Sequence, residues 1–412
     1  MNIQSMPQEL IVMVGENLSI KDLNNFLCTC RGLLNLLTPR LHKLGMQNVG
    51  RLSALQWAAK HGYEPLVKLA ILKGAKVNAI TKCKLKYTVL HLAATSVSPN
   101  PRIIRTLVEH GAKIGAKDAD LRTPLYRATC YGRGQVVEEL LRLGAGTKEG
   151  GSNGLIALAH IAAGRGDADC MRAFIAAGVD FHARGDFCRT ILHVAIACSS
   201  GLGMAQYLLE QEGGRMTVNA EDSVGSTPLH LLMDHYYLTS AEKSELLRSL
   251  LQCGADIHVK DKYGETPAHI AIDNDDISSV SELIRAGFNV YTKGAGGDTV
   301  LHRAVCGRGR GMKFLLALEA GRSIINVRNK KGATPLHLAV KECDRVKVEL
   351  LLRYGANTDV KDRKGRTPPQ VAVLQGKDSL VEAFKDAGVD FNSEKHTVKA
   401  LRKENRIRQK RQ

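Results

Sequence analysis

The sequence predicts an all-α solenoid of about ten helix-turn-helix repeats with projecting β-hairpin loops. Three observations predict it: a short phrase that recurs at a nearly constant step, an apolar stretch after each copy, and a glycine after most of those stretches. A single period that runs through most of a chain is typical of a repeat architecture, in which each unit buries its apolar face only against its neighbours.

The recurring phrase is a threonine, often a proline, and then leucine and histidine. Threonine is a good helix N-cap, and proline fits the first helical turn, where its missing N–H is not needed. The stronger copies begin at Thr88, Thr190, Thr227, Thr266, Thr299 and Thr334, and the weaker ones at Ser53, Thr123, Ala157 and Thr367. Successive copies lie 33 to 39 residues apart, so each copy starts the first helix of one repeat.

A second helix is predicted in each repeat. In the apolar stretch at 136–141, the spacing of valine and leucine gives a helix one buried face. A glycine such as Gly144 then supplies the left-handed residue that ends a helix, and a polar loop such as 260–264 leads to the next threonine. The sixth repeat has about five extra residues around Tyr236–Thr239, which predicts a long loop between its helices.

A unit of this length and order resembles the ankyrin repeat. The residues 222–230 and 254–257 carry the resemblance most closely, and it covers residues 53–392. It implies an interaction array that binds a protein target on a concave face lined by hairpin tips and first helices. The expected tip contacts are Lys84, Lys86, Leu121, Arg122, Tyr263, Lys330, Lys331, Arg363 and Lys364, whose excess of basic residues favours an acidic surface on the target.

Seven histidines recur at one repeat position: His91, His160, His193, His230, His269, His302 and His337. A row of histidines suggests a metal or catalytic site, but neighbours in this row are one whole repeat apart. The resemblance implies instead that they bond backbone and threonine groups between repeats. The glycine-rich segment 307–311 has the wrong spacing for a phosphate loop and falls between two helices. No catalytic, cofactor or metal site is predicted, and the chain is not expected to be an enzyme.

The first fifty residues do not fit the repeat. Three short amphipathic helices are predicted there, and they are too short to bury a core alone. The segment from about 5 to 45 resembles an F-box, on 6–10, Asp22-Leu23 and 28–31. Fungal proteins with an F-box before ankyrin repeats resemble the whole chain. This resemblance implies that a Skp-type adaptor of a cullin–RING ubiquitin ligase binds Pro7, Leu10, Val14, Leu18, Leu23 and Leu27. The alternative is a helical cap on the first repeat.

The formal net charge of +17 is divided among three regions. Residues 1–52 carry +2, the tail at 393–412 carries +6, and the remaining +9 is spread over 53–392. This distribution disfavours a concentrated nucleic-acid surface. Ten cysteines, most of them isolated and none in a Cys-x-x-Cys pair, favour a reducing compartment, and neither a secretion signal nor a membrane span is apparent. We therefore expect a cytoplasmic or nuclear protein.

Three domains are thus expected: an F-box-like segment at 1–52, the repeat array at 53–392, and a basic tail at 393–412. The leading hypothesis for function is a substrate receptor of a Skp-cullin-F-box ubiquitin ligase, with the target on the ankyrin face. The alternative is an ankyrin scaffold or inhibitor without a role in ubiquitin transfer. A nucleic-acid binder that depends on the tail is disfavoured, and an enzyme is the least favoured class.

Overall fold

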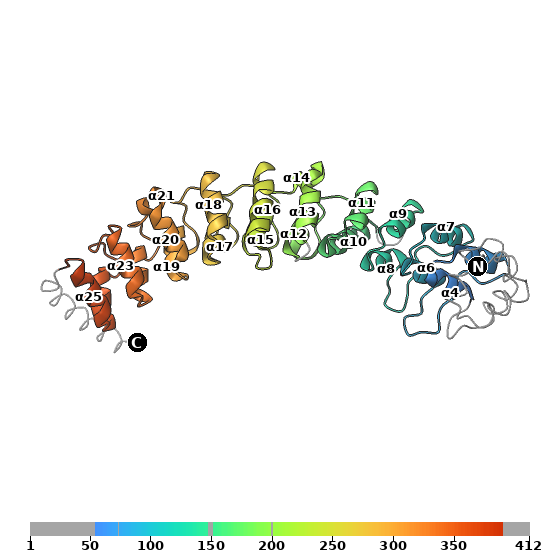
Figure 1. The fold of residues 1–412 in the computed structure, drawn as a ribbon, viewed down its shortest axis with the longest axis horizontal. Coiled ribbons are helices and arrows are strands. Elements are labelled where there is room, and N and C mark those ends of the chain that lie inside the picture. Colours follow the sequence, from blue (N-terminus) through green and yellow to red (C-terminus); the bar gives the residue numbers. More distant parts are fainter. Residues whose placement is uncertain (1–53, 73, 147–150, 199–200, 390–412) are drawn as a thin grey trace, which may run out of the picture. The chain divides into compact units, whose positions relative to one another are not determined.

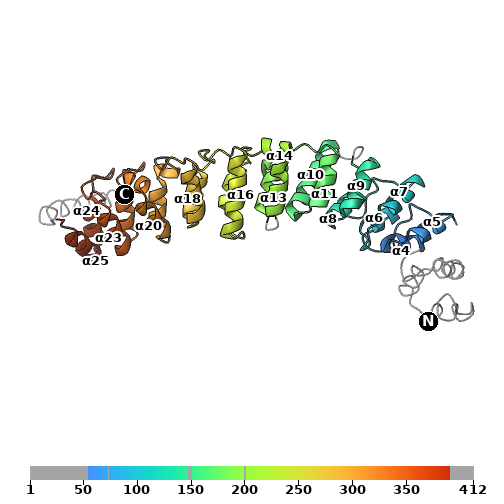
Figure 2. The ribbon, with the colours of Figure 1, turned by 45° about the horizontal axis from the view of Figure 1, so that its top comes forward.

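The computed structural model describes residues 54–72, 74–146, 151–198 and 201–389 (Figures 1 and 2). The F-box-like segment, its six adaptor-binding residues and the basic tail lie outside the described residues. The chain divides into two compact units, of which unit 1 is Met1–Ala162 with Asp167–Val179 and unit 2 is Ala163–Gly166 with Asp180–Gln412. Within the described residues, none of the helices is long and apolar enough to span a membrane.

Unit 1 contains antiparallel helix pairs in which each pair packs against the next. Helices α4, α6 and α8 pack in sequence, and α7, α9 and α11 form the second row. The helices are α4 Ala54–His61, α5 Glu64–Leu72, α6 Val89–Ala94, α7 Pro101–Glu109, α8 Pro124–Cys130, α9 Gly134–Arg142, α10 Gly151–Arg165 and α11 Ala168–Ala176. Helix α10 is longer than the other first helices because its repeat lacks the threonine-proline start.

Unit 2 repeats the same arrangement. Its first helices stack in the order α12, α15, α17, α19, α22 and α24, and the second helices lie beside them (Figure 2). The helices are α12 Ile191–Ala197, α13 Gly201–Glu210, α14 Glu212–Met216, α15 Pro228–Met233, α16 Ser240–Gln252, α17 Pro267–Asp273, α18 Ile277–Arg285, α19 Val300–Cys306, α20 Arg310–Ala317, α21 Glu319–Ser323, α22 Pro335–Lys341, α23 Arg345–Arg353, α24 Pro368–Gln375 and α25 Asp378–Asp386. Two short 3₁₀ turns, Asp186–Cys188 and Ala295–Gly297, lie in the loops.

The predicted helix starts are confirmed at the threonines. Thr88, Thr190 and Thr227 are N-caps, and each forms a capping box with the histidine three residues later. The apolar residues after each threonine are buried; Leu90, Leu192 and Leu229 are at most 1% exposed. The local capping interactions and the burial of apolar residues between repeats therefore favour the same helices.

The prediction of projecting β-hairpins is not confirmed. The described residues contain no β-strand, only an isolated antiparallel bridge between Ile80 and Thr88. The loops close with single backbone hydrogen bonds, for example from the Asp222 N–H to the Ser226 carbonyl at 2.9 Å. Each loop is too short to extend a ladder beyond one such pair, so the loops are tight turns.

Most second helices end at a left-handed glycine, as predicted; Gly144 and Gly254 have φ of 86° and 84°. The fifth and eighth repeats differ, because a short extra helix, α14 or α21, follows the second helix there. In both, a glycine packs against a backbone carbonyl of the preceding helix: Gly214 against Leu208, and Gly321 against Leu315. A Cβ atom at either glycine would overlap that carbonyl oxygen.

Candidate functional site

Five of the described loops that project from the repeats share one internal structure. In these five, the first residue of the tip is Asp or Asn, and its Oδ1 accepts from two backbone N–H groups further along the loop. Asp222 accepts from Val224 at 2.9 Å and from Ser226 at 3.0 Å. The same arrangement occurs at Asp118, Asp261, Asn329 and Asp362. A side chain thus fixes each turn from inside and leaves the tip side chains exposed.

Neighbouring tips are also joined through their backbones. In unit 2, the Lys262 N–H donates to the Val224 carbonyl at 2.9 Å, and the Arg363 N–H donates to the Lys331 carbonyl at 3.0 Å. In unit 1, the Ala119 N–H donates to the Leu85 carbonyl at 2.9 Å. These bonds set the spacing between successive tips without using a side chain.

The recurrent histidines join each first helix to the loop of the following repeat. In His193, Nδ1 accepts from the backbone N–H of Thr190 at 3.2 Å and contacts the Thr190 hydroxyl at 2.7 Å. Its Nε2 donates to the carbonyl of Ser226 at 3.0 Å. The residues with both kinds of contact are His91, His193, His230, His269, His302 and His337.

The structural role predicted for the histidines is therefore confirmed for these six, and His160 has in addition a contact within its own helix. The His160 Nδ1 lies 2.7 Å from the Ile156 carbonyl in its own helix, because this repeat has no threonine at the helix start. Burial lowers the pKa of the six ring systems, to about 4 for His193 and His269. Within the described residues, no group of three or more His, Cys, Asp or Glu side chains could hold a metal ion.

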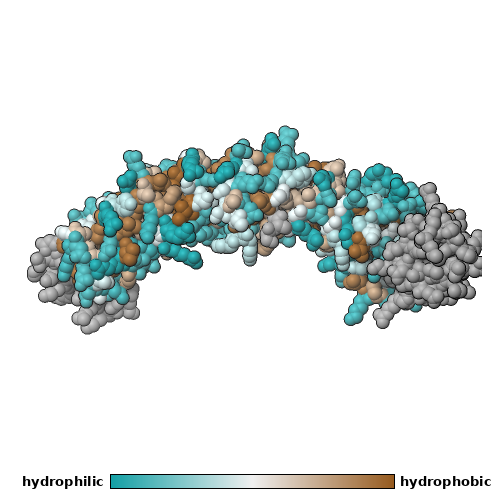
Figure 3. Space-filling view, in the orientation of Figure 1, coloured by the Kyte–Doolittle hydropathy of each residue, from teal (hydrophilic) through white to brown (hydrophobic). Residues whose placement is uncertain are grey.

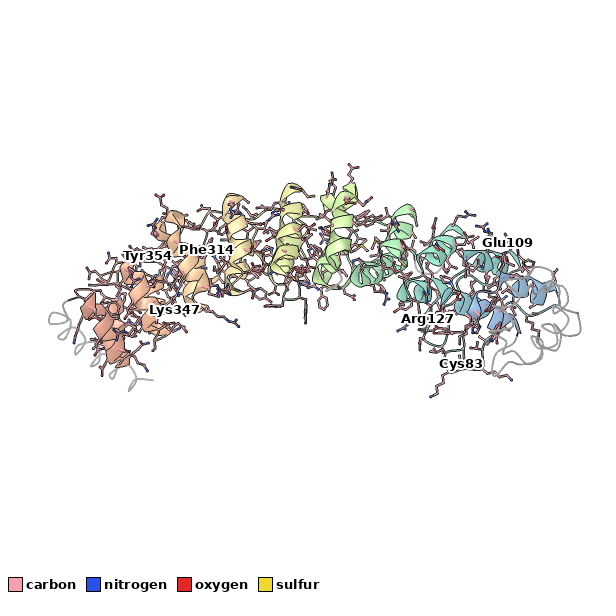
Figure 4. The ribbon with its side chains drawn as sticks, viewed as in Figure 1. Cys83, Glu109, Arg127, Phe314, Lys347 and Tyr354 are labelled. Atoms are coloured by element: carbon pink, nitrogen blue, oxygen red, sulfur yellow. The ribbon has the colours of Figure 1, made fainter. Side chains whose placement is uncertain are left out.

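In unit 1, the expected tip contacts are exposed and are supported by a buried arginine. Leu121 is 76% exposed, with a positive φ of 62°, next to exposed Arg122. Arg127 lies beneath this loop, and its guanidinium donates to Asp118 and Asp120, each at 2.7 Å. Burial raises the pKa of Asp118, but the Arg127 hydrogen bond opposes this and the net pKa is lowered. Figure 4 shows Arg127 above the neighbouring loop, which carries Cys83 and the exposed Lys84 and Lys86.

In unit 2, four expected tip contacts lie together. Lys330 and Lys331 are on one loop and Arg363 and Lys364 on the next, and all four are exposed. A groove of about 660 Å³ runs beside them and is also lined by Lys341 and Arg366 on its basic side, and by Asp298 and Asp362. Arg366 already pairs with Asp362 at 2.6 Å, whereas Lys341, the loop lysines and Arg363 are exposed to solvent.

Tyr263 lies in a different environment from the basic tips. It is 70% exposed and lines a groove of about 450 Å³ with Asp222, Asp234, Asp273 and a second tyrosine, Tyr236. Tyr236 is not among the predicted site residues. The extra residues of the sixth repeat, which include two adjacent tyrosines, were the signal that could have found it. Hydrophilic residues cover much of the face shown in Figure 3.

A family model for ankyrin repeats matches residues 26–118, 55–150, 159–242, 235–326 and 317–395. The chain belongs to the ankyrin-repeat family. Together with the helix pairs and the threonine–histidine contacts, this establishes an array that binds protein partners.

Several curated proteins are similar to the chain. E3 ubiquitin-protein ligase KEG of Arabidopsis thaliana is 26% identical over 68% of the chain and 20% of that protein. Human ankyrin repeat and SOCS box protein 16 is 32% identical over 53% of the chain and 48% of that protein. The mouse B-cell lymphoma 3 protein homolog is 28% identical over 49% of the chain and 44% of that protein. The chain thus matches less than half the length of each of these relatives.

Proposed function

We propose that this protein is a substrate receptor of a Skp-cullin-F-box ubiquitin ligase. The proposed organisation is an F-box-like segment at 1–52, about ten ankyrin repeats at 53–392 and a basic tail at 393–412. The ankyrin face holds the target, and Pro7, Leu10, Val14, Leu18, Leu23 and Leu27 contact the adaptor. We place it in the cytoplasm or nucleus because most of its cysteines are isolated in the sequence and none forms a Cys-x-x-Cys pair.

The observation that carries target binding is the group of exposed cations on two adjacent loops of unit 2. Lys331, Arg363 and Lys364 line a groove of about 660 Å³ together with only two carboxylates, and Lys330 is the exposed neighbour of Lys331. A surface of this kind attracts and orients an acidic partner. The ubiquitin role is supported by the F-box resemblance and by the name of one similar protein, an E3 ubiquitin-protein ligase.

Co-purification with a Skp-type adaptor tests the ligase role. The wild-type chain should retain the adaptor, and the double variant Pro7→Ala/Leu10→Ala should lose it, because both residues lie on the proposed adaptor contact. The variant Lys330→Glu/Lys331→Glu is the matched control, since it changes the ankyrin face and should still retain the adaptor. Failure of the wild-type chain to bind any adaptor would sink the ligase role.

The second candidate is an ankyrin scaffold or inhibitor in which the N-terminal helices only cap the first repeat. Deletion of residues 1–45 separates the two. A cap would be needed for folding, so its deletion should lower the melting temperature of the array or cause aggregation. A separable adaptor-binding segment would leave the melting temperature nearly unchanged.

A further inference from the structure

A second groove in unit 2 has the opposite chemistry to the basic one. It measures about 450 Å³ and runs along α15 and α17, from the projecting loops at one end to the loops between helices at the other. Tyr263 lines it at the first end and Tyr236 at the second. The two rings are 70% and 72% exposed. Exposed tyrosines on a groove wall provide contact area at low cost in conformational entropy.

The charged lining of this groove is mostly acidic. Asp222, Asp234, Asp261 and Asp273 line it, together with Arg189 and the buried His230, whose pKa is lowered by burial. Arg189 lies 3.5 Å from the Asp222 carboxylate, so its charge is already opposed. Arg303 in turn lies 3.4 Å from Asp273, so two of the four carboxylates face an arginine and the lining keeps an excess of negative charge in a chain that carries +17.

Two buried side chains, His235 and Lys243, fix the loop that carries Tyr236. His235 is buried, and its Nδ1 accepts from the backbone N–H groups of Tyr237 and Leu238, both at 3.3 Å. Lys243, also buried, donates to the Met233 carbonyl at 3.1 Å and pairs with Asp276 at 3.0 Å. These contacts anchor both ends of the turn, so the Tyr236 ring is positioned before any partner arrives.

Hydrogen bonding also places Tyr236 over the acidic residues. Its hydroxyl lies 3.2 Å from the Asp234 carboxylate and 3.2 Å from the side-chain carbonyl of Asn274. The negative charge of Asp234 raises the pKa of the tyrosine. Burial raises the pKa of Asp273 on the opposite side of the groove, although Arg303, at 3.4 Å, opposes the effect. A cation that entered the groove would meet carboxylates and aromatic faces together.

We propose that this groove binds a basic polypeptide segment of a partner, with an arginine or lysine side chain between Tyr236 and the carboxylates of Asp234 and Asp273. Cations stack on tyrosine faces and pair with carboxylates, so both elements of the lining favour the same ligand. An acidic segment or a nucleic acid would be repelled here. The proposal rests on the proposed target binding by the ankyrin face and adds a second contact of opposite charge to it.

Fluorescence anisotropy with labelled peptides tests the proposal on the full chain. The probes are a short peptide of alternating arginine and glycine, its lysine counterpart and its glutamate counterpart. The net charge of the chain repels the basic probes overall, so their binding reports a local acidic site. We expect Asp234→Asn/Asp273→Asn and Tyr236→Ala each to weaken the basic probes by about five-fold.

Two variants serve as matched controls. Tyr237→Ala removes the adjacent tyrosine, which is 82% exposed but does not line the groove, and it should leave the affinity unchanged. Asp359→Asn removes an exposed carboxylate elsewhere in unit 2 and should also have no effect. Circular dichroism at the assay temperature confirms that each variant is folded.

Three outcomes would overturn the proposal: no binding of either basic probe, equal binding by the wild type and Asp234→Asn/Asp273→Asn, or an equal loss with Tyr237→Ala. Failure here is distinguishable from failure of the proposed function, because adaptor retention depends on Pro7 and Leu10. Binding of the glutamate probe would be expected at the basic groove alone, so Lys330→Glu/Lys331→Glu should weaken it and Asp234→Asn/Asp273→Asn should not.

Discussion

At the scale of single residues, the imidazoles of the threonine–histidine pairs are held neutral. Nδ1 accepts a hydrogen bond from the threonine backbone, and Nε2 donates to the next repeat, as in His193 and His302. Protonation would place a second N–H where an acceptor is required, inside a buried contact. Burial accordingly lowers the pKa of both residues.

This arrangement predicts that unit 2 loses stability in acid. An unfolded histidine titrates near 6.5, whereas folded His193 and His269 titrate at about 4. The unfolded chain therefore binds more protons between these values. The stabilisation of the fold by each neutral histidine is fully present above pH 6.5. It is lost as the pH falls towards 4, which lowers the free energy of unfolding by up to about 3 kcal/mol for each of these two residues. Urea unfolding at a series of pH values between 7.5 and 4 measures it.

The chain itself offers a control for this effect. In the last repeat Gln370 replaces the histidine and still forms the capping box with Thr367. The variant His193→Gln/His269→Gln should therefore keep its helix starts and show a shallower decline in unfolding free energy between pH 6.5 and 4. A decline as steep as that of the wild type would show that other groups cause the acid sensitivity.

Arg127 predicts a second effect at this scale. Its side chain is 9% exposed and contacts the carboxylates of Asp118 and Asp120 and the ring of Tyr87. The variant Arg127→Met keeps the apolar length but leaves the buried Asp118 without its cation. We expect a loss of about 3 kcal/mol in the free energy of unfolding, measured by urea denaturation. Arg142→Met, at a largely exposed arginine, should cost less than about 1 kcal/mol; equal costs would contradict the argument.

At the scale of elements, the repeats end in two ways. Most second helices stop at a left-handed glycine, but α13 and α20 are followed by the short helices α14 and α21. Gly214 and Gly321 permit this ending, because each lies against a carbonyl oxygen of the preceding helix. The role of these glycines is close packing rather than a left-handed backbone.

Substitution by alanine should separate the two roles of glycine. Gly214→Ala places a Cβ on the Leu208 carbonyl oxygen, so the start of α14 must shift. We expect a loss of at least about 1 kcal/mol in unfolding free energy. Gly203→Ala is the control, because nothing lies within 4 Å of its Cβ and alanine favours the helix α13. It should be neutral or stabilise by up to about 1 kcal/mol. Thermal melting of both variants measures the difference. Equal destabilisation by Gly214→Ala and Gly203→Ala would contradict the proposed role of Gly214 in close packing.

At the scale of the whole molecule, the sequence was sufficient to predict the repeat architecture. The threonine phrase predicted the helix starts, and the extra residues of the sixth repeat predicted a longer loop, which spans 234–239 against 274–276 in the next repeat. The β-hairpins were not confirmed, because turn residues alone do not determine whether a loop extends into strands. The sequence did not predict that Tyr263 lines one groove whereas Arg363 lines another. This difference depends on which residues of neighbouring repeats come together in the fold.

The backbone bonds between neighbouring tips have a consequence for how readily this surface can change. Each bond is made by main-chain groups, for example the Lys262 N–H and the Val224 carbonyl. Nineteen of the twenty amino acids retain that N–H, and only proline lacks it. Exposed tip side chains with an ordinary backbone can therefore be exchanged while the bonds between the tips are preserved. Under the proposed function, such an array could acquire a new target by changing these side chains one at a time, with little effect on its stability.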